Sequence, residues 1–383
     1  MQRPIYLDYA ATTPVDPRVA EKITHCLTMD GNFGNPASTT HIYGAMALEA
    51  VEQARLEVAD LINAQSEEII WTSGATEANN LAIQGAAHFY QHKKNHIITV
   101  KTEHKAVLDV CYALAEQGFK VDYLSVQKNG LIDFDELKSL INNNTLLVSI
   151  MHVNNEIGII QDIEKIGQLT KQHQALFHVD AAQSAGRVAI DVEKMQIDLL
   201  SLSAHKMYGP KGIGALYVRK KPRVRLQPLM YGGAHQQGLR PGTLATHQIV
   251  GMGIAARLAK TEMLQDMLRI TQLRNQLWVL IKNLPGLHVN TDFTHAAGNY
   301  LNISFENIDG EVLLQALSEI AVSMGSACTS AQQTPSHVLK AMGISDQLAQ
   351  STLRITLGRF TSQADIDRAG AVIRTACCDI IRS

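Results

Sequence analysis

Cysteine is scarce in this sequence, and the few cysteines do not have the spacing of a metal or redox motif. The chain of 383 residues contains five cysteines and no CxxC pair. They are Cys26, Cys111, Cys328, Cys377 and Cys378. This pattern argues against a disulfide framework and against a structural zinc site. We expect most of these cysteines to be small buried hydrophobic residues.

The sequence also lacks long hydrophobic runs and an excess of charge of either sign. No apolar stretch is long enough to span a bilayer. The formal net charge of -2 provides no basic surface for nucleic acid. The first residues, MQRPIYLDYAATTPVDP, lack the apolar core of a secretory signal. We therefore expect a cytoplasmic protein that binds neither a membrane nor nucleic acid directly.

The first two-thirds of the chain alternate β-rich runs with helical patterns. Runs such as EEIIWTS, NHIITV, TLLVSIMHV and DLLSLSA are nearly continuous in apolar residues, as in strands that are covered on both faces. Repeated strand–helix units predict an α/β fold with a mostly parallel sheet and helices on both faces. The length of the chain favours two domains.

The last third has a different pattern. A long helix is predicted from about Gln248 to Lys282, and NYLNISFE and STLRITLGRF alternate as half-exposed strands would. The helical segment DGEVLLQALSE lies between them. We expect a large domain over residues 15–255 and a smaller α+β domain formed by residues 1–14 and 256–383.

Polar clusters follow the predicted strands, at the end where ligands of open parallel sheets bind. In TSGATEANN, glycine and hydroxyl residues stand at the start of a helix, where free N–H groups favour a phosphate. An ordinary helix N-cap is the alternative. The motif is neither the P-loop nor the dinucleotide-binding fingerprint.

Asp180 ends a predicted strand, where a buried carboxylate needs a cationic partner or becomes protonated. A protonated pyridine nitrogen would be such a partner, and the ring would then act as an electron sink. A structural turn cap is one alternative. A metal site is another, because His178 and Asp180 share one face of a strand and His152 or His205 could join them.

Lys206 stands at the exit of an apolar run, followed by Gly209-Pro210 and Gly212-x-Gly214. A lysine in a dry pocket has a lowered pKa and can bind an aldehyde covalently. A metal site would gain nothing from a cation at this position. The glycines predict tight packing of the chain around the amine, which disfavours an ordinary surface lysine.

Cys328 lies in VSMGSACTSAQQTPSH, among small residues without an apolar period. Such a composition predicts a mobile loop. An exposed cysteine can ionise and react, whereas a buried one is inert. Cys328 is therefore a candidate reactive thiol, and a loop thiol without function is the alternative.

Several motifs together resemble the cysteine desulfurases of the IscS/NifS type, which are pyridoxal-phosphate enzymes of fold type I in the class V aminotransferase family. The resemblance covers nearly the whole chain. It is carried by IYLDYAATTPVDPRV, FGNPAS, TSGATEANN, KTEHKAVLD, SIMHVNNEIG, FHVDAAQSAG, SLSAHKMYGPKGIGALYVR, GLRPGT, GSACTS and LRITLGRFT. It implies a fold-type I transferase whose smaller domain carries the catalytic cysteine loop.

The resemblance implies a site for pyridoxal 5'-phosphate on matching positions. Lys206 would bind the cofactor aldehyde, Asp180 would pair with the pyridinium nitrogen, and Gln183 would bond the phenolic oxygen. His104 would stack on the ring and help to move protons. The residues implied in phosphate binding are Ala75, Thr76, Ser203, His205 and, from the other subunit of a homodimer, Thr243.

The resemblance also implies how the substrate is bound. Asn155, next to the cofactor, and Arg354 would grip the carboxylate, since the arginine fork matches a carboxylate in two bonds. Cys328 would accept the sulfur of L-cysteine as a persulfide, leaving L-alanine. No resident metal is implied, although Cys328 could transiently ligate an iron–sulfur cluster.

The implied partners are sulfur acceptors for iron–sulfur cluster assembly or tRNA thiolation. The sequence given ends at RTACCDIIRS, earlier than is usual for the IscS type, whose further tail helps to dock the iron–sulfur scaffold. Docking of that scaffold is therefore left open. The alternatives are a selenocysteine lyase or another class V aminotransferase-like enzyme, and a non-catalytic sulfur-relay platform.

Overall fold

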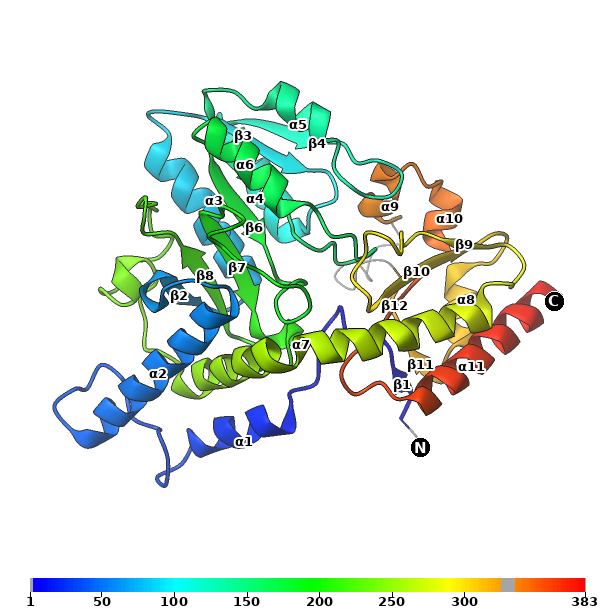
Figure 1. Cartoon of the computed structure of the whole chain (residues 1–383), viewed down its shortest axis with the longest axis horizontal. Coiled ribbons are helices and arrows are strands. Elements are labelled where there is room, and N and C mark those ends of the chain that lie inside the picture. The colour runs from blue at the N-terminus through cyan, green and yellow to red at the C-terminus, as the bar shows by residue number, and fades with distance from the viewer. Residues whose placement is uncertain (1–2, 325–334, 383) are drawn as a thin grey trace.

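The computed structural model describes residues 3–324 and 335–382, and Figure 1 shows how their elements are arranged. The helices are α1 (Pro17–His25), α2 (Ile42–Leu61), α3 (Ala75–Tyr90), α4 (Lys105–Glu116), α5 (Phe134–Leu140), α6 (Ile163–Gln172), α7 (Thr246–Ile281), α8 (Gly310–Ala316), α9 (His337–Ala341), α10 (Asp346–Gln350) and α11 (Gln363–Arg382). The strands are β1 (Ile5–Tyr6), β2 (Ile69–Thr72), β3 (His96–Val100), β4 (Lys120–Leu124), β5 (Thr145–Ser149), β6 (Leu176–Asp180), β7 (Leu199–Ser203), β8 (Gly214–Val218), β9 (Leu287–Val289), β10 (Tyr300–Phe305), β11 (Ile320–Ala321) and β12 (Thr352–Thr356). Short 3-10 turns are η1 (Ser66–Glu68), η2 (Ala204–Lys206) and η3 (Gln236–Gly238).

The largest sheet has the strand order β2-β8-β7-β6-β5-β3-β4. Its strands are parallel except β8, which pairs antiparallel with both β2 and β7. The predicted mostly parallel sheet is therefore confirmed. Since all strands but β8 run in one direction, the carboxyl ends of β2, β3, β5, β6 and β7 meet at one edge.

Both faces of this sheet are covered, which explains the nearly continuous apolar runs. Neighbouring residues of one strand point to opposite faces: Ile97 belongs to the core that includes residues of α3 and α4, whereas Ile98 belongs to the core that includes residues of α2, α6 and α7. Both side chains are fully buried. The helices on the two faces thus leave the edge of the sheet as the place for polar side chains.

A second core surrounds a smaller antiparallel sheet, β12-β10-β9. The long helix α7 connects the two cores, and it lies beside α2 at one end and beside α11 at the other (Figure 1). Its Met252 is buried in the first core and its Leu277 in the second. The predicted long helix is confirmed. It passes through positions 255–256, where the sequence analysis places the domain boundary, and that boundary stays a prediction.

The prediction of half-exposed strands near residues 300–306 and 351–357 is wrong. Every residue of β10 and β12 is buried. Leu301 and Ile355 belong to the second core, as the alternation predicts. The polar face is covered as well, because Asn302 donates to the carbonyl oxygen of Glu156 and Arg354 to Asp8.

Most of the cysteines that the structure describes are buried, as predicted. Cys26, Cys111 and Cys377 are buried, and Cys378 is exposed. Burial raises the pKa of the Cys111 and Cys377 thiols to about 12, so both are protonated and inert at neutral pH. In the part of the chain described, no helix is long and apolar enough to cross a membrane.

Candidate active site

The helix start that was predicted to bind phosphate lies at the edge of the sheet. Thr72 and Ser203 end β2 and β7, and both pair with Gly214, the first residue of β8. Helix α3 begins just after Gly74, and no side chain caps it. A Cβ atom on Gly74 would lie 4.0 Å from Oγ of Ser203. The uncapped N–H groups of α3 and the Ser203 hydroxyl thus form one polar cradle, which can hold an anion.

Gly214 keeps this cradle compact. A Cβ atom at this position would lie 2.5 Å from the carbonyl oxygen of Leu202 and 2.6 Å from Cα of Gly74. No other residue fits there without moving the backbone. Of the other predicted phosphate ligands, Ala75 is half-buried and Thr76 is exposed, and both stand in the first turn of α3.

Lys206 lies at the end of η2, immediately after β7. Its Nζ donates to the carbonyl oxygens of Ala10 (2.6 Å) and Ala11 (2.8 Å). The backbone behind it is compact, because a Cβ atom on Gly209 would lie 2.9 Å from the carbonyl oxygen of Ala204. The amine is therefore held by the main chain at the carboxyl edge of the sheet, with the tight glycine packing that the sequence predicts.

Gln183 joins the same hydrogen-bond network. Its Nε2 donates to the carbonyl oxygen of Ala10 (2.9 Å), which also accepts from Lys206. Its Oε1 accepts from Nη1 of Arg187 (2.8 Å) and from the hydroxyl of Tyr300 (2.9 Å). Gln183 is thus fixed beside the lysine by groups from three parts of the chain.

Asp180 ends β6 at this edge, and only 6% of it is exposed. Its Oδ2 accepts from Nδ2 of Asn79 (2.7 Å) and its Oδ1 from the backbone N–H of Ala182 (2.9 Å). It therefore does cap a turn, as one alternative proposed. Within the described residues, however, it forms no ion pair. A buried carboxylate whose only partners are neutral would be stabilised by a cationic group of a bound ligand.

Glu103 is a second buried carboxyl group near Asp180. Burial, and then the charge of Asp180, raise the pKa of Glu103 well above its usual range. Its Oε1 accepts from the backbone N–H of Met151 (2.5 Å), and its Oε2 has no partner among the described residues. The raised pKa favours the protonated form of the Glu103 carboxyl group.

His104 forms the N-cap of α4, with its Nδ1 accepting from the backbone N–H of Ala106 (3.1 Å). This bond places the proton of the neutral imidazole on Nε2. His104 is half-buried and follows β3, so it also stands at the carboxyl edge of the sheet.

Arg354 and Asn155 meet on the side of the smaller sheet. Nη1 of Arg354 donates to the carbonyl oxygen of Asn155 (3.1 Å), and Nη2 pairs with Oδ1 of Asp8 (2.8 Å). Oδ2 of Asp8 accepts from the hydroxyl of Ser323 (2.8 Å). Nε of Arg354 has no partner among the described residues. The guanidinium is thus held in place with donor capacity left for a carboxylate.

The histidines that could have formed a metal site have other surroundings. His178 lies between the hydroxyls of Ser149 (2.8 Å) and Ser201 (3.0 Å). Burial lowers the pKa values of His178 and His152 to about 4. Across residues 3–324 and 335–382, no three His, Cys, Asp or Glu side chains are grouped so that they could hold a metal ion.

His205 lies beside Lys206 and contacts Oγ1 of Thr12 through its Nδ1 (3.1 Å). Burial, and then the positive charges of Lys206 and Lys211, lower the pKa of His205 to about 4. The imidazole is therefore neutral at pH 7. It can offer an N–H to an anion but adds no charge to it.

One predicted site residue, Thr243, is not part of this arrangement: it is exposed on the single chain, in the segment before α7. Cys328 lies outside the described residues. The sequence analysis also missed Asn79, Asp8 and Tyr300. Asn79 and Asp8 lie within quoted motifs, TSGATEANN and IYLDYAATTPVDPRV, but neither motif tells which side chain they contact.

Comparisons with known proteins identify the family of the chain. The family model described as aminotransferase class-V matches residues 5–369, and the chain belongs to this family. Over 380 residues it is 57% identical to "Cysteine desulfurase IscS" of Shewanella sediminis (strain HAW-EB3), covering 99% of this chain and 94% of that protein. It is 59% identical over 374 residues to the protein of the same name from Tolumonas auensis (strain DSM 9187 / NBRC 110442 / TA 4), covering 98% and 93%.

Solved structures are also similar. A "NifS-like protein" superimposes with a TM-score of 0.91 at 36% identity, covering 98% of this chain and all of that one. "SspA in complex with cysteine" superimposes with a TM-score of 0.83 at 42% identity, covering 94% and 100%. These findings confirm the predicted resemblance, the fold type and the predicted enzyme class, that of the cysteine desulfurases.

Proposed function

We propose that this chain is a pyridoxal-phosphate-dependent cysteine desulfurase that removes sulfur from L-cysteine and leaves L-alanine. The observation that carries the proposal is that an amine held by the main chain and a buried carboxylate lie at the same edge of the sheet. Lys206 supplies the amine, and Asp180 is the carboxylate without a cationic partner among the described residues.

The residues of this edge fit the cofactor. The start of α3, with Ser203 beside it, would hold the phosphate, and Asp180 would keep the ring nitrogen protonated. Gln183 would face the phenolic oxygen, since its amide already lies beside the amine of Lys206. When bound, the cofactor supplies an electron sink for the bonds to the α-carbon of the amino acid.

The protein side chains would bind the substrate and move its protons. Arg354, fixed by Asp8, would bind the carboxylate of L-cysteine through N–H donors that Asp8 and Asn155 leave unused. His104, with its proton on Nε2, would exchange protons near the ring. Lys206 would accept the α-proton of the substrate at its Nζ.

Cys328 would receive the sulfur. Its thiolate attacks the substrate sulfur, an S–S bond forms, and the C–S bond of the substrate breaks. The carbon keeps the electron pair and takes a proton, which gives L-alanine and a persulfide on Cys328. Four residues of chain span at most about 14 Å, so position 328 is tethered close to Met324, whose neighbour Ser323 pairs with the backbone of Arg354.

The test is to add L-cysteine and locate the sulfur by mass spectrometry. We expect L-alanine to form and Cys328 to gain one sulfur atom. Cys328→Ala should retain the cofactor and lose alanine formation, whereas Cys378→Ala, which removes the exposed cysteine of α11, should behave as the wild type. Undiminished sulfide production by Cys328→Ala would contradict the role of this thiol.

The same proposal includes a cytoplasmic homodimer that passes sulfur to acceptor proteins of iron–sulfur cluster assembly or tRNA thiolation. Large apolar side chains are exposed between α1 and α2 and in the first turns of α2, where a second copy would cover them. They are Leu27, Met29, Phe33, Ile42, Tyr43 and Met46. Thr243, also exposed, would reach the phosphate of the other subunit.

Two alternatives make different predictions. A selenocysteine lyase would release selenium from selenocysteine and leave L-cysteine intact. A non-catalytic sulfur platform would be colourless and would not bleach on reduction with borohydride. The chain resembles proteins named cysteine desulfurase over nearly its whole length, which supports a cysteine desulfurase over these two alternatives.

A further inference from the structure

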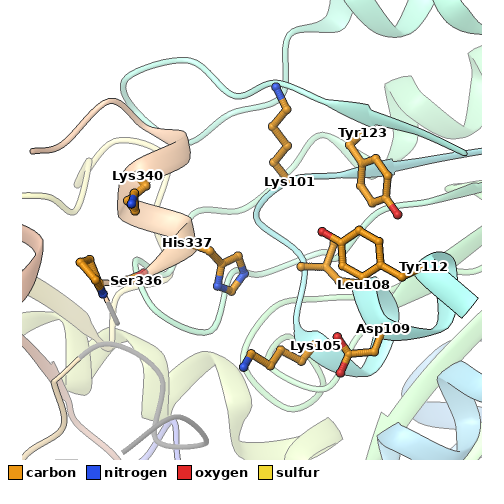
Figure 2. Close-up of a pocket in the computed structure, with 10 residues that line it drawn as sticks. Lys101, Lys105, Leu108, Asp109, Tyr112, Tyr123, Ser336, His337 and Lys340 are labelled. Atoms are coloured by element: carbon orange, nitrogen blue, oxygen red, sulfur yellow. The ribbon is translucent and has the colours of Figure 1, made fainter. Parts of the chain in front are cut away.

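A pocket of about 620 Å³ lies between helix α4, with the strands beside it, and helix α9, outside the network around Lys206. Figure 2 shows its walls: α4 and the strands next to it form one side, and α9 forms the other. The lining residues are Lys101, Lys105, Leu108, Asp109, Tyr112, Tyr123, Pro335, Ser336, His337 and Lys340.

The walls carry an excess of positive charge. Lys101, Lys105 and Lys340 line the pocket from both sides, and Asp109 is the single carboxylate among the lining residues. Lys340 pairs with Asp346 (3.1 Å), but both side chains are exposed, so this pair is weak. Lys105 has no ion pair within residues 3–324 and 335–382. Its charge is available for an anionic ligand.

The pocket also offers an aromatic surface. The rings of Tyr112 and Tyr123 are stacked, with centroids 5.3 Å apart, and Tyr112 is 54% exposed. The hydroxyl of Tyr123 is buried and has no hydrogen-bond partner among the described residues. Partly exposed tyrosine rings are enriched at protein-binding surfaces, because one ring offers both an apolar face and a polar group.

The pocket lies near residues that are proposed to take part in sulfur transfer. Nε2 of His337 contacts the carbonyl oxygen of Glu103 (2.9 Å), the residue before His104. In the sequence, Cys328 lies seven positions before Pro335, which lines the pocket, and seven steps of chain span at most about 25 Å. A protein bound in the pocket is therefore within reach of the chain that carries the proposed sulfur donor.

We propose that this pocket docks an acidic segment of the protein that accepts the sulfur. That the partner accepts sulfur rests on the proposed function, whereas the acidic character of the docked segment is inferred from the pocket alone. Lysines on two opposite walls match Asp and Glu side chains that follow one another along a segment, while the tyrosine pair packs against its apolar groups.

The test measures binding of a short fluorescein-labelled peptide of Asp, Glu, Leu and Gly to the cofactor-loaded protein by fluorescence anisotropy. The variant combines Lys105→Glu with Lys340→Gln, one change on each wall. Glu in the first turn of α4 is favourable for the helix, so folding is not endangered. The control combines Lys93→Glu with Lys282→Gln, exposed positions after α3 and α7 with the same change in charge.

We expect salt-sensitive binding to the wild type and the control, and binding at least about tenfold weaker to the pocket variant. Alanine formation with a small thiol as acceptor should be equal in all three proteins. Equal peptide binding by the two variants would overturn the docking proposal, even if alanine forms. Tighter, pocket-dependent binding of a short single-stranded RNA, or complete displacement by phosphate at constant ionic strength, would also overturn it. Absence of alanine formation would instead count against the proposed function.

Discussion

Lys206 and Gln183 donate to the same main-chain oxygen. Nζ of the lysine lies 2.6 Å, and Nε2 of the glutamine 2.9 Å, from the carbonyl oxygen of Ala10. This oxygen belongs to the N-terminal segment, which thereby sets the position of two side chains from the loops after β6 and β7. The amine and the amide are thus ordered by the protein itself, which reduces the entropy cost of binding a cofactor between them.

Replacing Gln183 should therefore affect stability as well as the site. Gln183→Leu removes the acceptor of the fully buried Tyr300 hydroxyl and one acceptor of Arg187. We expect the free energy of unfolding to fall by about 2–4 kcal/mol, because buried polar groups lose their partners. Gln172→Leu, at an exposed position of α6, should change it by less than about 0.5 kcal/mol. Urea denaturation compares the two; equal stability of both variants would contradict the network.

Arg354 should be needed as a guanidinium and not only as a cation. Arg354→Lys keeps the charge beside Asp8 but loses the fork that can bind a carboxylate in two bonds. We expect the KM for L-cysteine to rise by about 10–100-fold, with cofactor content unchanged. Steady-state alanine formation measures the KM, and absorbance measures the cofactor. An unchanged KM would show that another group binds the carboxylate.

The buried histidines predict a loss of stability in weak acid. Burial lowers the pKa of His152 in the folded protein to about 4, whereas the unfolded chain titrates near 6.5. Below pH 6.5 the unfolded state binds the proton that the folded state refuses, so the free energy of unfolding falls as the pH drops towards 4.

This pH dependence can be assigned to a single side chain. Between pH 7 and pH 5, His152 should account for a loss of about 2 kcal/mol. His152→Leu removes the titrating group and should therefore reduce the pH dependence by that amount. Its Nδ1 has no hydrogen-bond partner among the described residues, so the substitution breaks no hydrogen bond at this atom. Urea midpoints at the two pH values measure the effect. The same pH dependence in the variant would mean that His152 is protonated in the folded protein.

Glu103 should have the opposite pH dependence. Burial and the charge of Asp180 raise the pKa of its carboxyl group in the folded state. Above pH 4.5 the unfolded chain releases this proton and the folded protein keeps it, so Glu103 lowers stability as the pH rises. Glu103→Gln, neutral and of equal shape, should therefore stabilise the protein more at pH 8 than at pH 5. Thermal midpoints at both pH values test this, and a variant that is less stable at pH 8 than the wild type would contradict it.

The large sheet was predictable because its strands are apolar on both faces and its turns carry polar residues. β6 and the side chain of Asp180 lie where ALFHVDAA places them. The smaller sheet was only partly predictable. The alternation in β10 and β12 marks the face that packs on α7 and α11, but it does not show that other segments bury the polar face.

The site was predictable as a set of strand ends, but its partners were not. Asp8 and Arg354 lie 346 positions apart in the sequence, and nothing in either motif indicates that they form an ion pair. Asn79 likewise stands on the inner side of α3, where only the packing of that helix brings it to Asp180. Long-range contacts of this kind depend on tertiary packing, which local patterns do not encode.

The proposed activity depends most on the covalent attachment of pyridoxal phosphate to Lys206. The most direct measurement is reduction of the purified protein with borohydride, followed by digestion and mass spectrometry. We expect the added pyridoxyl-phosphate mass on the peptide that contains Lys206, and no addition in Lys206→Ala. Attachment at Lys211 instead, or no addition to the wild-type protein after incubation with pyridoxal phosphate, would contradict the central claim.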